Sequence, residues 1–200
     1  MSADRIGAIV YDGADPADDP RWRLSGARTR AEYGRWCGHC CGMACLHMAL
    51  DHRDGHAPPL LELLRGCRDY GGYVEDDDGQ IKGLIYAPFA DYVRAEHGMP
   101  ADVHPHLAAA ELPDLLADGH LVIASVHKEI RQPEMPAPGR GGHLVLITGH
   151  DHGLLHLHNP SGHTPDARRA RLPIEVFASF FAGRGVALSM RRAYRDRVAR

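Results

Sequence analysis

The spacing of hydrophobic residues predicts helices in the first half of the chain. From Cys41 onward, Met43, Leu46 and Leu50 recur at the spacing of one helical face, which indicates a buried helix that begins at Cys41. Four more helices are predicted, most of them opening near a proline and closing near a glycine, over residues 59–68, 88–97, 107–117 and 173–182.

The second half of the chain changes to short β-prone runs bounded by turn residues, at residues 121–126, 143–148 and 154–158. Helices first and strands second predict an α+β fold, with N-terminal helices packed on a C-terminal antiparallel sheet. No internal repeat or linker divides residues 1–200, so a single domain is expected. Within it, residues 1–30 are predicted to form an extended surface arm, because Asp, Pro, Ala and Gly dominate from residue 12, and residues 190–200 a frayed basic tail.

Composition narrows the classes of function. A chain of 200 residues with 44% hydrophobic and 24% charged residues is typical of a soluble globular domain. The net charge of -3, without a basic stripe, argues against nucleic acid as a partner. No apolar run approaches the roughly 18 residues of a membrane span, and no secretion signal opens the chain, so we expect a cytoplasmic protein without a membrane partner. The oligomeric state cannot be read from the sequence.

Five cysteines, four of them within residues 37–45, are an odd count in a chain with no export signal. Free thiols are therefore expected rather than a disulfide framework. Cys41 is the candidate nucleophile, because the start of a helix offers partial positive charge and free backbone N–H groups, which lower the pKa of a thiol. The following Gly42 would let a substrate carbonyl approach the backbone, whose N–H groups can stabilise an oxyanion. A cysteine at a helix start is often only a small buried residue, so this interpretation requires a base elsewhere.

A candidate base follows from the expected hairpin around residues 149–153. If this loop joins two antiparallel strands symmetrically about Asp151, His143 and Asn159 lie directly opposite each other and point to the same face. The carboxamide oxygen would then accept a hydrogen bond from the imidazole, fixing its tautomer and leaving the other ring nitrogen free to face a thiol. A one-residue shift in register would turn one of the two side chains to the other face.

Three short blocks resemble one family. The stretch CGMACLHM at residues 41–48 resembles the Cys-Gly-Pro-Ala-x-Leu-x-Met stretch of the bacteriocin-processing, double-glycine-leader class of papain-like cysteine peptidases. GHLVLITG at residues 142–149 resembles the Gly-His-x-Val-Val-Val-x-Gly strand of that class, and HNPSG at residues 158–162 its Asp-Pro-x-x-Gly strand end. The blocks lie in the family's order, and the stand-alone bacterial members look most similar.

The resemblance implies a papain-like fold with Cys41 as nucleophile, His143 as general base and acid, and Asn159 in place of the usual aspartate. Gly42 and Gly142 are expected to contribute to oxyanion or substrate binding. The substrate would be a peptide or another amide or thioester, cleaved through a thioester acyl-enzyme, with no cofactor and no metal ion. An amide-forming acyltransferase of the same fold in natural-product assembly and a peptide-binding pseudoenzyme stay open as alternatives. The stretches at residues 70–73 and 82–86 are predicted to line the cleft.

One departure from the family concerns the glutamine that stabilises the oxyanion. In the family it precedes the cysteine, whereas the glutamines of this chain, Gln80 and Gln132, both follow Cys41. Either another donor serves, or the glutamine belongs to residues ahead of Met1. A missing donor costs about 2.7 to 4 kcal/mol of transition-state stabilisation, which slows hydrolysis without abolishing it.

Three other kinds of site compete with the thiol enzyme. Cys37 and Cys40, with Cys41, Cys45 and nearby histidines, have the beginnings of a zinc-ligand spacing, although no separate second pair is evident. The glycine-rich loop at residues 138–142 resembles a phosphate-binding loop but precedes a strand instead of a helix. Ser125 lacks the nucleophile-elbow pattern of a serine hydrolase, so a strand residue is the simpler interpretation.

Overall fold

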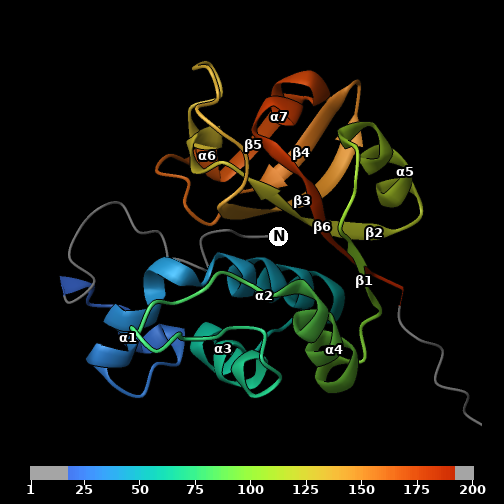
Figure 1. Cartoon of the computed structure of the whole chain (residues 1–200). Coiled ribbons are helices and arrows are strands. Elements are labelled where there is room, and N and C mark those ends of the chain that lie inside the picture. Colours follow the sequence, from blue (N-terminus) through green and yellow to red (C-terminus); the bar gives the residue numbers. More distant parts are fainter. Residues whose placement is uncertain (1–17, 192–200) are drawn as a thin grey trace, which may run out of the picture.

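Helices fill the first half of the chain and strands most of the second, as the sequence predicts (Figure 1). The computed structural model describes residues 18–191. The first four α-helices lie together on one side of the sheet: α1 (Arg30–Trp36), α2 (Cys41–Asp54), α3 (Leu60–Asp69) and α4 (Tyr86–His97). Three short α-helices follow: α5 (Leu112–Ala117), α6 (Pro165–Arg168) and α7 (Ile174–Phe180). Within the described residues, no helix is long and apolar enough to cross a lipid bilayer.

Local sequence signals set the ends of these helices. Thr29 precedes α1, and its hydroxyl accepts a hydrogen bond from the backbone N–H of Glu32 (3.0 Å), which satisfies one of the free N–H groups of the first turn. Gly55 ends α2 in the left-handed conformation (φ 81°), which glycine adopts without steric cost. The predicted helix starting at Cys41 is therefore confirmed, and it continues past Leu50 to Asp54.

Helix α2 runs through the middle of the molecule between α3 and the sheet (Figure 1). It is buried on most sides rather than along one stripe, because Met43, Ala44 and Leu46 are all fully inaccessible to solvent. Fully burying a side chain such as Met43 or Leu46 stabilises the fold by about 1.5 to 3 kcal/mol. The start of α2 is thereby held firmly in place, and the position of Cys41 depends on it.

Six strands form one antiparallel sheet in the order β1-β6-β2-β3-β4-β5. Their bounds are β1 (Ala101–His104), β2 (His120–Val126), β3 (His143–Asp151), β4 (Leu154–His158), β5 (Arg169–Pro173) and β6 (Phe181–Ser189). The α+β architecture and the three predicted strands are thus confirmed. The central strands β2, β3 and β6 are apolar on both faces, as expected for a sheet that is covered on both sides.

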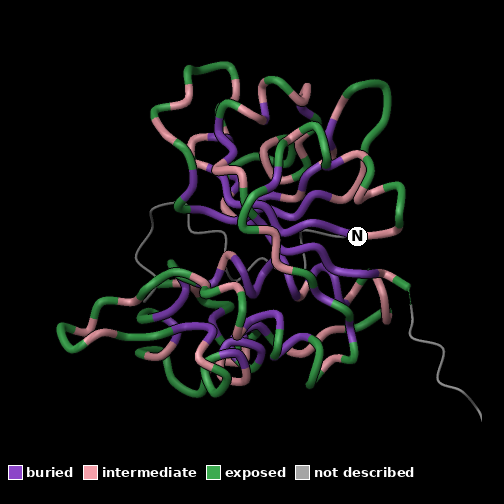
Figure 2. Tube along the Cα trace, turned by 45° about the vertical axis from the view of Figure 1, so that its right-hand side comes forward, coloured by how far each residue is buried: buried purple, intermediate pink, exposed green. Residues whose placement is uncertain are grey.

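Alternate residues of the central strands belong to two separate hydrophobic cores. Figure 2 shows that the middle of the molecule is largely buried. Ile123 and Leu146 pack with the four large helices, whereas their neighbours Val122 and Val145 pack with residues of α5 and α7 on the other face. A one-residue slip in any of these strands would exchange the two faces, so burial on both sides fixes the register.

Several elements depart from the sequence-based expectation. The helix expected at 107–117 begins as a 3-10 turn, η5 (Ala109–Glu111), before α5, and the helix expected at 173–182 ends at Phe180 because β6 begins there. Helix α1 and strands β1, β5 and β6 carry no clear periodic signal. Within the predicted arm, residues 22–25 form a 3-10 helix, η3 (Trp22–Ser25), in which Trp22 is buried. Residues 1–17 of the arm and 192–200 of the tail lie outside the described residues.

Candidate active site

Cys41 is the first residue of α2 and is half-buried. Burial raises the pKa of its thiol, and the backbone N–H groups of Leu144, Gly42 and Cys41 itself act in the opposite direction without cancelling that rise. Leu144 is the residue directly after His143. The sulfur therefore lies against the start of β3, a strand that is about one hundred residues away along the chain.

His143 and Asn159 are brought together as predicted. The Nε2 atom of His143 lies 2.8 Å from Oδ1 of Asn159, and both side chains are buried. Because Oδ1 of a carboxamide can only accept, Nε2 carries the proton and donates it in this bond. Nδ1 is then the unprotonated nitrogen of the neutral ring. Burial lowers the pKa of His143, while the bond to Asn159 raises it, and the net direction is downward.

The predicted register of this hairpin is wrong, although the predicted contact is right. The turn is formed by two residues, His152 and Gly153, both with positive φ (46° and 78°), and it pairs Asp151 with Leu154. Thr148 is then an extra residue, because Ile147 pairs with Leu157 but Gly149 pairs with His156. Such a β-bulge shifts the register by one.

The bulge places His143 and Asn159 on the same side of the ribbon. Beyond it, the register puts Leu146 opposite His158, so Asn159 falls next to Val145 and diagonal to His143. Diagonal neighbours on one face are close enough for long side chains to touch. A regular ladder with the same two-residue turn and no bulge would instead put Asn159 opposite Leu146, on the face away from His143.

Ser161 is a third polar residue in contact with this pair, and it was not among the candidate site residues. Its hydroxyl lies 3.1 Å from Nε2 of His143 and 3.1 Å from Oδ1 of Asn159, and its backbone N–H also donates to Oδ1 (3.0 Å). Three donors thus converge on the carboxamide oxygen, which fixes the orientation of Asn159. The sequence offered one signal, a serine two residues after the asparagine. Serine is also a common turn residue, so this signal does not distinguish a site residue from a turn.

Replacing Ser161 by alanine tests this arrangement. We expect Ser161→Ala to lower the free energy of unfolding by about 1 kcal/mol and to reduce the alkylation rate of Cys41 by about threefold, because a neutral hydrogen bond contributes about 0.5 to 1.5 kcal/mol. Ser179→Ala is the matched control, since the Ser179 hydroxyl also bonds within its own segment, to Val176 O at 2.7 Å, but on the exposed surface of α7. Equal alkylation rates for both variants would contradict the positioning role of Ser161.

Cys41 and His143 line the same pocket, a cavity of about 180 Å³ between the start of α2 and the sheet. Its wall is formed by eleven residues, three of them glycines: Gly38, His39, Cys41, Gly83, Leu84, Tyr86, Ser125, Gly142, His143, Leu144 and Arg184. The prediction that residues 82–86 line the cleft is confirmed by Gly83, Leu84 and Tyr86, whereas no residue of the 70–73 stretch lines it. His39 and Arg184 also line the pocket, and no sequence pattern indicated them.

The two predicted glycines have different surroundings. Gly142 lines the pocket next to His143. Gly42 is buried, and a Cβ atom there would meet Leu84 at 2.8 Å, Tyr73 Oη at 3.0 Å and Leu144 at 3.1 Å. Close packing therefore accounts for glycine at position 42, and a role for its N–H in oxyanion binding stays a prediction. Neither Gln80 nor Gln132 lines the pocket, so neither replaces the family's glutamine in this structure.

The competing kinds of site find no support in the structure. All five cysteines are free, as predicted. Among residues 18–191, no three His, Cys, Asp or Glu side chains gather in a way that could hold a metal ion. The glycine-rich loop leads directly into β3, with no helix after it, and Ser125 is a residue of strand β2.

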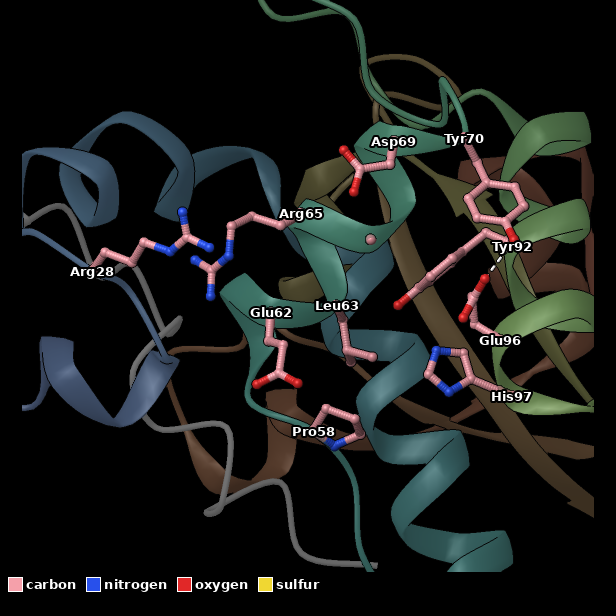
Figure 3. A pocket seen from close by; sticks show the side chains of 11 residues that line it. Arg28, Pro58, Glu62, Leu63, Arg65, Asp69, Tyr70, Tyr92, Glu96 and His97 are labelled. Atoms are coloured by element: carbon pink, nitrogen blue, oxygen red, sulfur yellow. Dashed lines mark hydrogen bonds between the residues drawn. The ribbon is translucent and has the colours of Figure 1, made fainter.

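A larger pocket, of about 620 Å³, lies between α3 and α4 (Figure 3). The Tyr92 ring lies against Gly66, where a Cβ atom would come within 2.7 Å of it, and the Tyr70 hydroxyl donates to Glu96 at 2.5 Å. No cysteine or serine lines this pocket. The smaller pocket beside Cys41 is therefore the candidate active site.

Comparisons with known proteins bear on the fold. No protein-family model matches the chain, and no curated protein matches it either. Among solved structures, a C39-like peptidase from Bacillus anthracis is similar, with a TM-score of 0.57 and 14% identity over 78% of this chain and 91% of that one. The peptidase domain of Streptococcus ComA, a bifunctional ABC transporter involved in a quorum-sensing pathway, has a TM-score of 0.52 and 17% identity over 76% of this chain and 91% of its own. The chain therefore has the papain-like fold of C39-like peptidase domains, with helices packed on an antiparallel sheet.

Proposed function

We propose that this chain is a cysteine peptidase-like hydrolase that cleaves a peptide or related amide bond with Cys41, His143 and Asn159. The proposal rests on one arrangement: His143 is hydrogen-bonded to Asn159, and His143 lines the same pocket as Cys41. A nucleophile, a base and a group that orients the base are the components of acyl transfer by a thiol. The C39-like peptidase fold supports the same reaction class.

The reaction begins from a neutral pair. Burial raises the pKa of Cys41 and lowers that of His143, so both directions favour thiol and neutral imidazole over thiolate and imidazolium. Asn159 is uncharged and cannot stabilise the imidazolium as an aspartate would. Proton transfer from Sγ to Nδ1 therefore accompanies the attack of sulfur on the substrate carbonyl carbon, with His143 as general base.

The remaining steps return the enzyme to its starting state. The protonated His143 gives its proton to the leaving nitrogen, the C–N bond breaks, and the acyl group stays on Cys41 as a thioester. Water then attacks the thioester carbonyl while His143 takes its proton, and the carboxylic acid leaves as Sγ is reprotonated. Backbone N–H groups at the start of α2 are the donors proposed for the oxyanion, in place of the family's glutamine.

The proposal is tested by labelling and by product analysis. A peptidyl epoxide probe should label Cys41 in the wild-type chain and leave Cys41→Ala unlabelled, while Cys45→Ala, which removes a fully buried thiol of the same helix, should retain labelling. Mass spectrometry of a peptide library after incubation should show cleaved products that disappear with Cys41→Ala.

Adding a primary amine to the incubation separates hydrolysis from acyl transfer. Products that carry water support the hydrolase, whereas products that carry the amine even at low amine concentration would identify an acyltransferase. No cleavage of any peptide, together with a Cys41 thiol no more reactive than the buried thiol of Cys67, would contradict the proposal.

A further inference from the structure

An irregularity in β6 brings a charged residue to the wall of the candidate active site. Val126 pairs with Phe181 and Ala124 pairs with Gly185, so the single residue Ser125 of β2 faces three residues, 182–184, of β6. The bulge is held in place by a hydrogen bond from the backbone N–H of Leu107 to the carbonyl of Gly183 (2.8 Å). Bulges redirect side chains out of the regular alternation of a strand. Here the redirected side chain is that of Arg184, which lines the pocket.

Arg184 and Ser125 present donors to the same place. A Cβ atom on Gly141 would lie 3.3 Å from the Ser125 hydroxyl and 3.4 Å from Nη2 of Arg184, so both groups surround the residue that comes two positions before His143. Ser125 also lines the pocket. A guanidinium and a hydroxyl on one side of a cavity are both able to donate hydrogen bonds to one anionic group.

The charge around the pocket is uncompensated. Of the eleven lining residues none is acidic, and Arg184 is the one with a permanent full charge. Across residues 18–191, the side chain of Arg184 makes no hydrogen bond or ion pair. Most arginines with a structural role pair with a carboxylate, as Arg65 does with Glu32 (2.8 Å). Arg184 is therefore available to a ligand.

We propose that Arg184, assisted by Ser125, binds a carboxylate of the substrate beside the carbonyl that Cys41 attacks. This inference rests on the proposed function, because only an enzyme that acts through Cys41 has a substrate at this site. The substrate class is a peptide or amide with a carboxylate close to the bond that is cleaved. Arginine suits the task because its planar guanidinium matches a carboxylate in a bidentate manner and stays charged at all physiological pH values.

The charge selectivity of Cys41 alkylation tests the site without requiring any turnover. Iodoacetate and iodoacetamide attack the same sulfur and differ mainly in one negative charge. We expect Arg184→Gln to lower the ratio of the iodoacetate rate to the iodoacetamide rate at Cys41 by about threefold to tenfold, as expected for a charge pair near the surface. The ratio cancels any change in the thiolate fraction. Tandem mass spectrometry assigns the label, because four cysteines share the segment 37–45.

Two variants control the measurement. Arg184→Lys keeps the positive charge and should retain most of the ratio. Arg171→Gln removes an equal charge from β5, which is four strands away from β6, and should leave the ratio unchanged. A drop for Arg184→Gln that shrinks when the salt is raised from about 0.05 M to about 0.5 M supports the site, since salt screens exposed charges. An unchanged ratio in Arg184→Gln, or an equal drop in Arg171→Gln, overturns the proposal.

The source of the carboxylate is assigned by protection of Cys41 from iodoacetamide. N-acetylglycylglycine offers a terminal carboxylate, and the α-amide of N-acetylglutamate offers one on a side chain. One of them should slow alkylation in the wild-type chain and lose this effect in Arg184→Gln. Protection by neither, or equal protection by uncharged N-acetylglycylglycinamide, contradicts the inference. Because alkylation needs no catalysis, a chain that failed to cleave peptides but kept the charge-dependent ratio would refute the proposed function while leaving the anion site standing.

Discussion

Replacing His143 by alanine should lower hydrolysis by Cys41 about 10⁴-fold, the largest loss of activity expected from a substitution other than at the nucleophile. The neutral pair explains the size of the effect. Burial leaves the thiol protonated, so without an acceptor at Nδ1 there is neither a base to take the proton nor an acid for the leaving nitrogen. Hydrolysis of a peptide that the wild-type chain cleaves, followed at saturating concentration, gives the measurement.

A surface histidine of the same hairpin provides the control. His150 is exposed on β3 and lines no part of the pocket, so His150→Ala should keep the wild-type rate. The His143→Ala chain should melt within a few degrees of the wild-type chain, which would show that chemistry rather than folding was lost. A rate within tenfold of the wild-type rate would remove His143 from the mechanism.

The substitution Gly162→Ala should cause a large loss of stability, about 3 kcal/mol of the free energy of unfolding. Gly162 is buried, and a Cβ atom there would lie 2.5 Å from Arg168 N, 2.6 Å from Ala167 C and 2.7 Å from Ala167 O. These are backbone atoms, which cannot rotate away. The same segment supports the site, since Arg168 O accepts the backbone N–H of Asn159 (2.9 Å). Displacing it should therefore also move Asn159 and reduce activity.

Denaturant unfolding monitored by circular dichroism measures this loss. Gly34→Ala is the matched control, because Gly34 lies in α1 with no atom within 4 Å of the added methyl group. Alanine is the better helix former by about 1 kcal/mol, so this control should be as stable as the wild-type chain or more so. Equal midpoints for Gly162→Ala and the wild-type chain would show that the 167–168 backbone adapts freely.

Periodicity and turn chemistry were sufficient to predict the main elements near the site. The helix at Cys41 and the strands at His143 and Leu154 are found where the sequence places them, because these segments have strong apolar patterns and clear boundaries. Strand β6 was missed because Gly183 and Gly185 interrupt its apolar run. In the structure Gly185 permits a close approach, since a Cβ there would meet Ile123 O at 2.4 Å. Single-sequence periodicity cannot distinguish such a glycine from one in a loop.

The site was predicted in part. The pairing of His143 with Asn159 was inferred from a longer turn than the structure has. The shorter turn changes the parity of the register, and the bulge at Thr148 restores it, so the predicted contact still forms. The surroundings of the thiol were predicted only in part, through the stretch at residues 82–86. Arg184 reaches the pocket through an irregularity of a strand that the sequence pattern did not reveal, and Ser161 matters because of a turn after β4. Both depend on tertiary geometry, which spacing along one chain does not encode.

Because of the extra residue at Thr148, the contact between His143 and Asn159 depends on the number of residues between them. Side chains alternate along a strand, so an odd number of insertions or deletions between His143 and Asn159 would leave every active-site residue in the chain and still point one of the partners away. Two changes together, or one change absorbed by the bulge, would leave the geometry intact. Related chains can therefore vary in the length of this hairpin as long as the parity of the register is kept, and a hairpin with all three residues but the opposite parity would separate His143 from Asn159.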